Sequence, residues 1–384
     1  MTDRPISRGR KLLYYGIMFV LLALVIELCC RAYYYQALAP PKRFATAQLF
    51  SDLGDRLSSH HDDDLLTGRL EHNQYLVRPE ASKADNDEID RECRAANRAV
   101  FASWVEFAFS DFRSKYVNVV DHRRRSVPDR SDAASDSAAR PFRIFFLGGS
   151  TMYGLDVTDA ETIPSAFVRA YRQKFPGGRP IRVYNLGMPY YYSYQELILL
   201  SDRLFHNDRP DMIVMLDGLN DCFEAGAAIE RAPVFAPRMQ DRIMPGDVKF
   251  FAQQMQNYQD FPAGMSADSA ASLVAARYLE NIRNARDLAG WYHIPLYCFW
   301  QPVPYYDYPN QPNDPICTHA RNSHIEKIYP IVRDSAAQTP YLTWLGDMLH
   351  DEKGLPFVDQ LHYSPSFNRA IAEKILSHIS IDGK

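Results

Sequence analysis

Short apolar runs alternate with longer amphipathic stretches over the C-terminal part of the chain. Apolar runs of this length, bounded by polar and turn-forming residues, are typical of strands that are buried on both faces. They lie at residues 143–147, 181–186, 212–216 and 296–300, with a weaker run at 341–345. The pattern therefore predicts five buried strands.

Helical spacing fills the gaps between these runs. Ile163, Phe167 and Tyr171 recur every four residues and so share one face of a helix. A long amphipathic stretch at 269–288 and a final one at 365–379 show similar spacing. Alternating strands and helices predict an α/β fold, with a three-layer, doubly wound, mostly parallel sheet. In such sheets, active sites lie at the carboxyl ends of the strands.

Two of the predicted helices carry start signals. Pro164 suits the first turn of the helix that follows the first strand. Before the last helix, Ser364 is a good N-cap and Pro365 a good first helical residue.

The N-terminus contains an apolar run at residues 12–30 that only Glu27 interrupts. A helix of this length spans a bilayer core of roughly 30 Å. More basic residues precede the run than follow it, so residues 1–11 are predicted to be cytoplasmic and 12–35 to form one transmembrane helix. The rest of the chain would then be periplasmic or extracellular. The alternative is a signal peptide cleaved after Ala39, which Pro40 at the next position disfavours.

A polar, irregular segment follows the apolar run. We expect residues 36–140 to form a stalk and accessory segment, and 141–384 the catalytic domain. The histidine and aspartate cluster at 60–64 is predicted to be a solvated charge run. Aromatic residues return at 100–120, so this part should pack onto the following domain, and 126–140 has the composition of a loop.

Composition and cysteine content narrow the classes of function. A net charge of −4 gives no sign of the concentrated basic surface that nucleic-acid binding needs, so no nucleic-acid partner is expected. Two of the six cysteines lie in the apolar N-terminal run, and the pairing of the other four stays open. Those four are Cys93, Cys222, Cys298 and Cys317. Cys317, His319 and His324 offer metal-ligand types without an evident fourth ligand, so no metal or cofactor is expected.

Residues that can do chemistry lie directly after the predicted strands. The first strand ends in Gly148-Gly149-Ser150-Thr151, where the glycines allow a sharp turn and the Ser150 hydroxyl can be exposed. Taken alone, this could be a serine helix cap after a glycine turn. Met152 stands where the nucleophile elbow of α/β-hydrolases requires its last glycine, so that motif is absent. Phosphate-binding and dinucleotide-binding glycine motifs are absent too.

Three further groups complete an ordered set. Gly187 follows the second strand, Gly218-Leu219-Asn220-Asp221 follows the third, and Asp359-Gln360-Leu361-His362 stands just before the last helix. In this order the residues resemble the SGNH (GDSL-type) serine hydrolase family, of its membrane-anchored bacterial type. The usual Gly-Asp-Ser-Leu block is here Gly-Gly-Ser-Thr, which keeps the nucleophile.

The resemblance covers residues 142–384 and implies a flavodoxin-like SGNH hydrolase fold and a set of roles. Ser150 would be the nucleophile, His362 the general base, and Asp359 the carboxylate that orients the imidazole. The oxyanion hole would comprise the backbone N–H groups of Ser150 and Gly187 and the side-chain amide of Asn220. This chemistry needs no cofactor.

The expected reaction is hydrolysis of acyl (acetyl) esters of a saccharide or glycoconjugate. Acyl transfer to a polysaccharide hydroxyl would use the same acyl-enzyme, and a lipid esterase is a third possibility. A non-catalytic binding or assembly protein on this fold is the alternative from another class. The aromatic run at 190–194 could stack on a sugar or pack internally, and the insertion at 223–266 could cover the site. Protein partners are not predicted.

Overall fold

The computed structural model describes five residues near the N-terminus and most of the chain from residue 83 onward. These are Tyr15, Met18, Leu21, Leu22 and Val25, and residues 83–102, 104–127, 140–230, 264–309, 323–359 and 361–381. Contacts divide the chain into two compact units, Met1–His61 and Asp62–Lys384. The fold below is that of the second unit.

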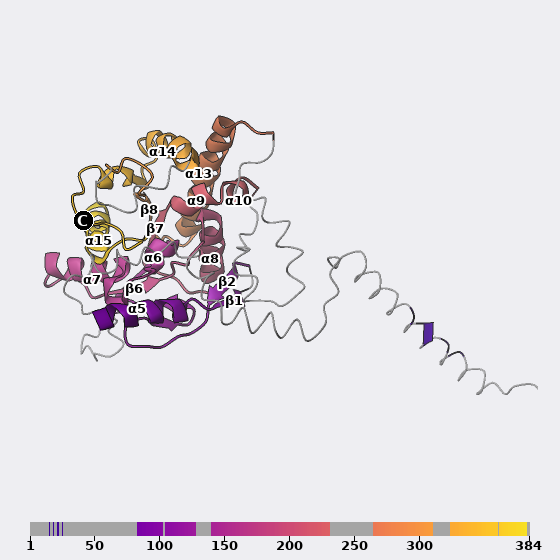
Figure 1. The fold of residues 1–384 in the computed structure, drawn as a ribbon, viewed down its shortest axis with the longest axis horizontal. Helices are drawn as coiled ribbons and strands as arrows, with labels where there is room; N and C mark the ends of the chain where they lie inside the picture. The colour runs from indigo at the N-terminus through magenta and orange to yellow at the C-terminus, as the bar shows by residue number, and fades with distance from the viewer. Residues whose placement is uncertain are drawn as a thin grey trace, which may run out of the picture. The chain divides into compact units, whose positions relative to one another are not determined.

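A seven-stranded sheet forms the centre of this unit (Figure 1). Its order is β3-β4-β6-β5-β7-β8-β9, and the last five of these strands run parallel. The strands are β3 (Val119–Val120), β4 (Arg123–Arg124), β5 (Phe142–Gly148), β6 (Ile181–Asn185), β7 (Met212–Asp217), β8 (Leu296–Trp300) and β9 (Leu342–Trp344). All five predicted strands are confirmed, as is the mostly parallel α/β class.

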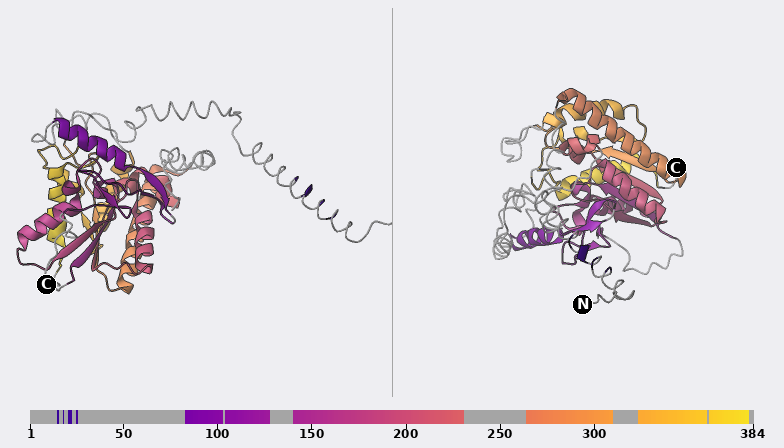
Figure 2. Two further views of the ribbon diagram at one scale, coloured as in Figure 1. Left: turned by 90° about the horizontal axis from the view of Figure 1, so that it is seen from below. Right: turned by 90° about the vertical axis from the view of Figure 1, so that its right-hand side faces the viewer.

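Helices cover both faces of the sheet, as the left view of Figure 2 shows. One face is covered by α7 (Ile163–Lys174) and α15 (Pro365–His378), which pack against each other. The other is covered by α8 (Ser193–Phe205), α13 (Ala267–Trp291) and α14 (Ser323–Ala336). Three short helices follow strands or loops at the carboxyl side: α6 (Ser150–Tyr153), α9 (Leu219–Phe223) and α10 (Ala225–Glu230).

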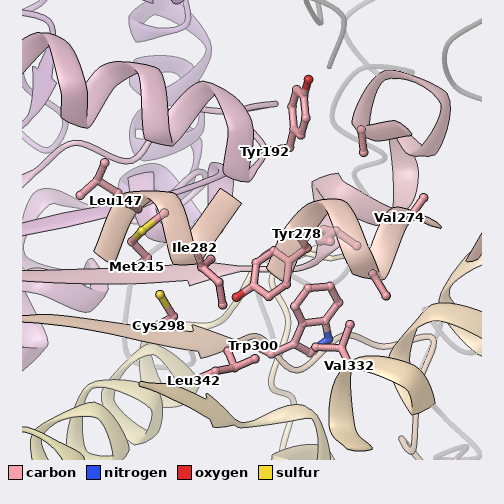
Figure 3. Packing of buried hydrophobic residues seen from close by; sticks show 14 of the residues in the cluster. Leu147, Tyr192, Met215, Val274, Tyr278, Ile282, Cys298, Trp300, Val332 and Leu342 are labelled. Carbon is pink, nitrogen blue, oxygen red and sulfur yellow. The ribbon is translucent and has the colours of Figure 1, made fainter. Parts of the chain in front are cut away.

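The period-two alternation of strand side chains explains the two separate cores. In β5, Phe145 and Leu147 face α8 and α13, whereas Ile144 and Phe146 face α7 and α15. Figure 3 shows the first core, in which Trp300 of β8 and Tyr278 of α13 meet edge to face with ring centroids 4.6 Å apart. Because both faces are covered, most positions of the central strands β5, β7 and β8 are apolar.

The predicted helix starts are present. The Ser364 side chain accepts a hydrogen bond from Phe367 N, and Pro365 is the first residue of α15. At α7, Thr162 is the N-cap and Pro164 lies in the first turn. These caps fix where the chain enters each helix, and for α15 that point lies two residues after His362.

The accessory segment contributes to the same compact unit. Helix α5 (Lys83–Ala96) and the hairpin of β1 (Ala99–Ala102) and β2 (Glu106–Phe109) share a core with Tyr153, Met188 and Tyr191. Strand β4 pairs antiparallel with β6 and so extends the main sheet. The predicted accessory segment from residue 83 to 140 and the predicted catalytic domain from residue 141 thus belong to one compact unit, Asp62–Lys384.

Among the described residues, no helix has the length and apolar character needed to cross a bilayer. The predicted transmembrane segment at 12–35 lies, except for the five residues named above, outside the described part. So does the 60–64 cluster. Cys93, Cys222 and Cys298 are buried, Cys222 and Cys298 as free thiols, and Cys317 lies outside the described residues.

Candidate active site

Ser150, His362 and Asp359 form a continuous hydrogen-bonded chain at the carboxyl end of the sheet. The His362 Nε2 lies 2.9 Å from Ser150 Oγ, and His362 Nδ1 lies 2.5 Å from Asp359 Oδ2. An ionised Asp359 can only accept, so Nδ1 carries the ring proton and Nε2 accepts from the Ser150 hydroxyl. This is the tautomer that a general base needs.

Asp359 is held as a carboxylate. It is fully buried, and burial opposes its ionisation. The charge of the His362 imidazole, its hydrogen bond, and the N–H groups of His362 and Leu361 outweigh burial and keep the pKa of Asp359 below its ordinary value. Those backbone groups donate to Asp359 Oδ1 over 2.7 and 2.8 Å. The carboxylate is therefore fixed in orientation as well as in charge.

The turn that carries Asp359 and His362 closes on itself. Val358 N donates to His362 O over 2.8 Å, and Ser364 N donates to Pro356 O over 2.7 Å. The chain then enters α15, which packs on α7 and fixes the turn against the sheet. The Asp-x-x-His spacing thus assembles the pair locally, as the sequence predicts.

Glycine lets three strand-end loops approach one another closely. A Cβ at Gly149 would lie 2.5 Å from Asn220 Nδ2, so the residue before the nucleophile touches the predicted oxyanion amide. Gly218 has φ +132°, and a Cβ there would lie 2.9 Å from the Trp300 ring. The loops after β5 and β7 therefore converge at Ser150.

Two of the three predicted oxyanion donors are placed next to the nucleophile. Ser150 is the first residue of α6, where a backbone N–H has no partner within the helix. The Asn220 amide donates one N–H to Tyr191 O over 2.6 Å. An amide nitrogen carries two hydrogens, so a second N–H remains for a developing oxyanion.

The third predicted donor is Gly187. Its N–H donates to Asn185 Oδ1 over 3.0 Å. A Cβ at Gly187 would lie 2.5 Å from Tyr153 N, so the glycine allows the loop after β6 to pack against α6. In this structure the Gly187 N–H is bonded to Asn185 and the glycine serves close packing, and its role as an oxyanion donor stays a prediction.

The aromatic run after Gly187 is mostly internal. Tyr191 and Tyr192 are 2% and 1% exposed, and the Tyr191 hydroxyl donates to Phe107 O of the accessory segment. These two rings pack inside the unit and cannot stack on a sugar. Tyr190 and Tyr194 of the same run are partly exposed, as are Phe223 and Tyr305, whose ring centroids lie 5.8 Å apart.

Sequence reasoning missed a buried group of carboxyl side chains beneath the β7–α9 loop. Asp221 accepts from the Ser193 hydroxyl over 2.6 Å and from Ser193 N, and burial raises its pKa to about 6 despite these bonds. Glu196 and Asp217 face each other, and their four oxygens meet no N–H or O–H donor within the described ranges. Burial and neighbouring carboxylates raise the pKa of Glu196 well above its ordinary value, and burial raises that of Asp217 to about 8. Both carboxyl groups therefore favour the protonated form at neutral pH.

A second missed residue is Asp156, which lies beside the catalytic pair. One ligand atom each from Asp156, Asp359 and His362 lie within 4.8 Å of one another. Both nitrogens of His362 already bond to Ser150 and Asp359, so a metal ion would have to displace one of these partners.

Of the metal candidates in the sequence, His324 lies in α14, and Cys317 and His319 lie outside the described residues.

No protein-family model matches the chain, and no curated protein matches its sequence. Solved structures match part of it. A gut microbial diltiazem-metabolizing enzyme is 17% identical over 64% of this chain with a TM-score of 0.37, and the match spans 48% of that enzyme. An acetyl-xylooligosaccharide esterase from Geobacillus is 15% identical, covering 63% of this chain and 94% of its own, with a TM-score of 0.34. A GDSL-like lipase from Bacteroides thetaiotaomicron is 13% identical, with coverages of 62% and 87% and a TM-score of 0.33. At such low identities and TM-scores, inference about this chain rests on its own site.

Proposed function

We propose that this chain is a serine esterase of the SGNH type that forms an acyl-enzyme on Ser150. The observation that carries the proposal is the hydrogen-bonded chain from Ser150 Oγ through His362 to Asp359, with spacings of 2.9 and 2.5 Å. Nucleophile, base and orienting carboxylate at such spacings are the arrangement that activates a serine hydroxyl.

The geometry supports a two-step reaction. Ser150 Oγ attacks the acyl carbonyl while His362 Nε2 takes its proton, and Asp359 stabilises the imidazolium that results. Negative charge on the carbonyl oxygen is met by the Ser150 N–H and the Asn220 amide. The ester bond breaks as His362 returns the proton to the leaving alcohol. Water, activated by the same base, then releases the acid and restores Ser150.

The proposed substrate is an acyl ester of a saccharide or glycoconjugate outside the cytoplasmic membrane. Partly exposed rings at Phe223 and Tyr305 support this, because Phe223 lies in α9, three residues after Asn220, and its ring contacts that of Tyr305. Rings of this kind offer an apolar wall to a sugar face. Transfer of the acyl group to a polysaccharide hydroxyl would use the same acyl-enzyme, with the sugar in place of water.

Labelling with a fluorophosphonate tests the nucleophile. The full-length protein should label covalently, and Ser150→Ala should abolish labelling and ester turnover with an unchanged melting temperature. Equal labelling of the variant would refute the assignment, as would an inert wild-type protein. Adding an acetylated donor and an oligosaccharide acceptor, with mass spectrometry of the sugar, separates hydrolysis from transfer: free acetate indicates an esterase and acetylated acceptor a transferase.

A further inference from the structure

Asp156 occupies an unusual position for an acidic residue. It lies in the loop after α6, three residues beyond the end of the helix that Ser150 begins. Its backbone has φ +66°, in the left-handed region that favours glycine, and its side chain is 2% exposed. Asparagine and aspartate tolerate this conformation best among residues with a side chain. A charged side chain with so little exposure points to a role in the interior.

Asp156 lies beside Asp359, the orienting carboxylate, and His362, the base. The group formed by Asp156, Asp359 and His362 has ligand atoms within 4.8 Å of one another, and all three residues are buried. At such separations an opposite charge shifts a pKa by about one to three units when little water intervenes. The carboxylate of Asp156 is thus close enough to act on the charge of the imidazole.

The accessory segment holds the loop of Asp156 from both sides. Arg124 of β4 donates to Gly154 O over 3.2 Å and to Val157 O over 2.7 Å, on either side of Asp156. Its Nε also donates to Asp159 Oδ1 over 2.9 Å, and its side chain is 1% exposed. A buried guanidinium with four fixed contacts, including the Tyr153 ring, leaves the loop little freedom. The position of Asp156 is therefore built into the fold.

We propose that Asp156 is a second acidic positioning residue for His362. Its negative charge makes the His362 imidazole a stronger base. This inference rests on the proposed function. As Ser150 attacks, the proton moves from its Oγ to His362 Nε2, and the imidazolium then faces two carboxylates, Asp359 and Asp156. Both favour the charged ring. Ser150 Oγ also lies within hydrogen-bond distance of the His362 ring, and Arg124, which holds the loop of Asp156, is ion-paired with Asp159.

Two substitutions separate this role from a merely conformational one. Asp156→Asn removes the charge and keeps the shape, and Asp156→Gly removes the whole side chain. Both residues adopt a positive φ readily, so the loop keeps its backbone. Asp121→Asn is the matched control, since Asp121 also has positive φ, at +51°, but is exposed in the turn between β3 and β4.

The measurement is the pH profile of kcat/KM for a chromogenic acetyl ester, with the purified full-length chain. His362 acts in its neutral form, so loss of a nearby negative charge should move the acidic limb to lower pH, by about one unit. The kcat on the plateau should fall roughly tenfold and KM should change little, because the imidazolium forms only during reaction. The control variant should match the wild type.

An unchanged profile in both Asp156 variants, with wild-type kcat, would overturn the proposal, as would an effect on KM alone. Labelling of the wild type and of both variants with a fluorophosphonate is measured in parallel. An inert wild type removes the proposed function and this inference together. An active wild type with unaffected variants removes only the role of Asp156.

Discussion

At the scale of single residues, Asn220 is the donor most open to test. Its amide touches Gly149 and is oriented by Tyr191 O, so it is fixed before substrate arrives. Asn220→Ala should lower kcat by roughly two to three orders of magnitude with a smaller change in KM, because the amide acts mainly on charge that develops in the transition state. Stopped-flow or steady-state hydrolysis of an acetyl ester measures this. Unchanged kcat would show that Asn220 only closes the turn.

The raised pKa values of Glu196 and Asp217 predict a pH-dependent stability. With a folded-state pKa raised to about 8, Asp217 stabilises the fold fully below its unfolded pKa, and this contribution is lost as pH rises through the folded value. Asp217→Asn supplies an N–H to Glu196 and removes one titration. Its melting temperature should vary less than that of the wild type between about pH 5 and 9, with a difference on the order of 5 °C by pH 9. The same pH dependence of the melting temperature in both proteins would contradict the raised pKa of Asp217.

The sequence draws attention to the three predicted triad residues because their signals are local, and the structure brings their side chains together. Ser150 follows an apolar strand, and Asp359 and His362 lie on one turn before a capped helix. The hydrogen bond from Gly187 N–H to Asn185, two residues earlier, gives no signal in the hydrophobic pattern of the sequence. The sequence gives no signal for the position of Asp156 either. Its importance depends on a backbone angle and on a neighbour more than 200 positions away in the chain.

At the scale of elements, Arg124 links the β3–β4 hairpin to the loop beside the nucleophile. Asp159 accepts from Arg124, Asn118 N and Asn118 Nδ2, so the ion pair is a buried network. Arg124→Met should lower the free energy of unfolding by about 3–5 kcal/mol, because Asp159 is left buried without its cation. Urea unfolding measures this loss.

A double variant supplies the control for that prediction. Arg124→Met with Asp159→Asn removes both charges and should recover part of the stability. If the double variant is less stable by the full sum of the two single effects, the pair is not coupled and the network does not hold the loop. Ester turnover by the folded Arg124→Met variant would then show whether the loop that carries Asp156 has moved.

The elements that sequence patterns reveal are those with a long apolar signal. All six positions of β7 are buried, and such a run is easily recognised. Strands β3 and β4 have two residues each, which is too short for any period, and β4 carries two arginines. Burial of Arg124 depends on a partner 35 positions later. The hairpin could therefore not be distinguished from a polar linker.

At the scale of the whole molecule, the apolar run at 12–30 predicts how the chain is anchored in the membrane. We expect the N-terminus to stay in the cytoplasm, the segment at 12–35 to remain in the membrane, and the catalytic unit to face the periplasm or the exterior. Carbonate extraction of membranes, followed by protease treatment of intact spheroplasts, tests both points. A soluble chain whose first residue is Pro40 would contradict the anchor and indicate cleavage.

The 212 positions between Ser150 and His362 also impose an order in time. At synthesis rates of about 5–20 residues per second, the nucleophile leaves the ribosome roughly 10 to 40 seconds before its base. His362 lies on the turn that leads into α15, and α15 packs on α7. Until His362 is in place, Ser150 in the nascent chain has the reactivity of an ordinary serine and does not attack esters. Chemical competence thus comes last, after nearly the whole catalytic unit has been made and folded.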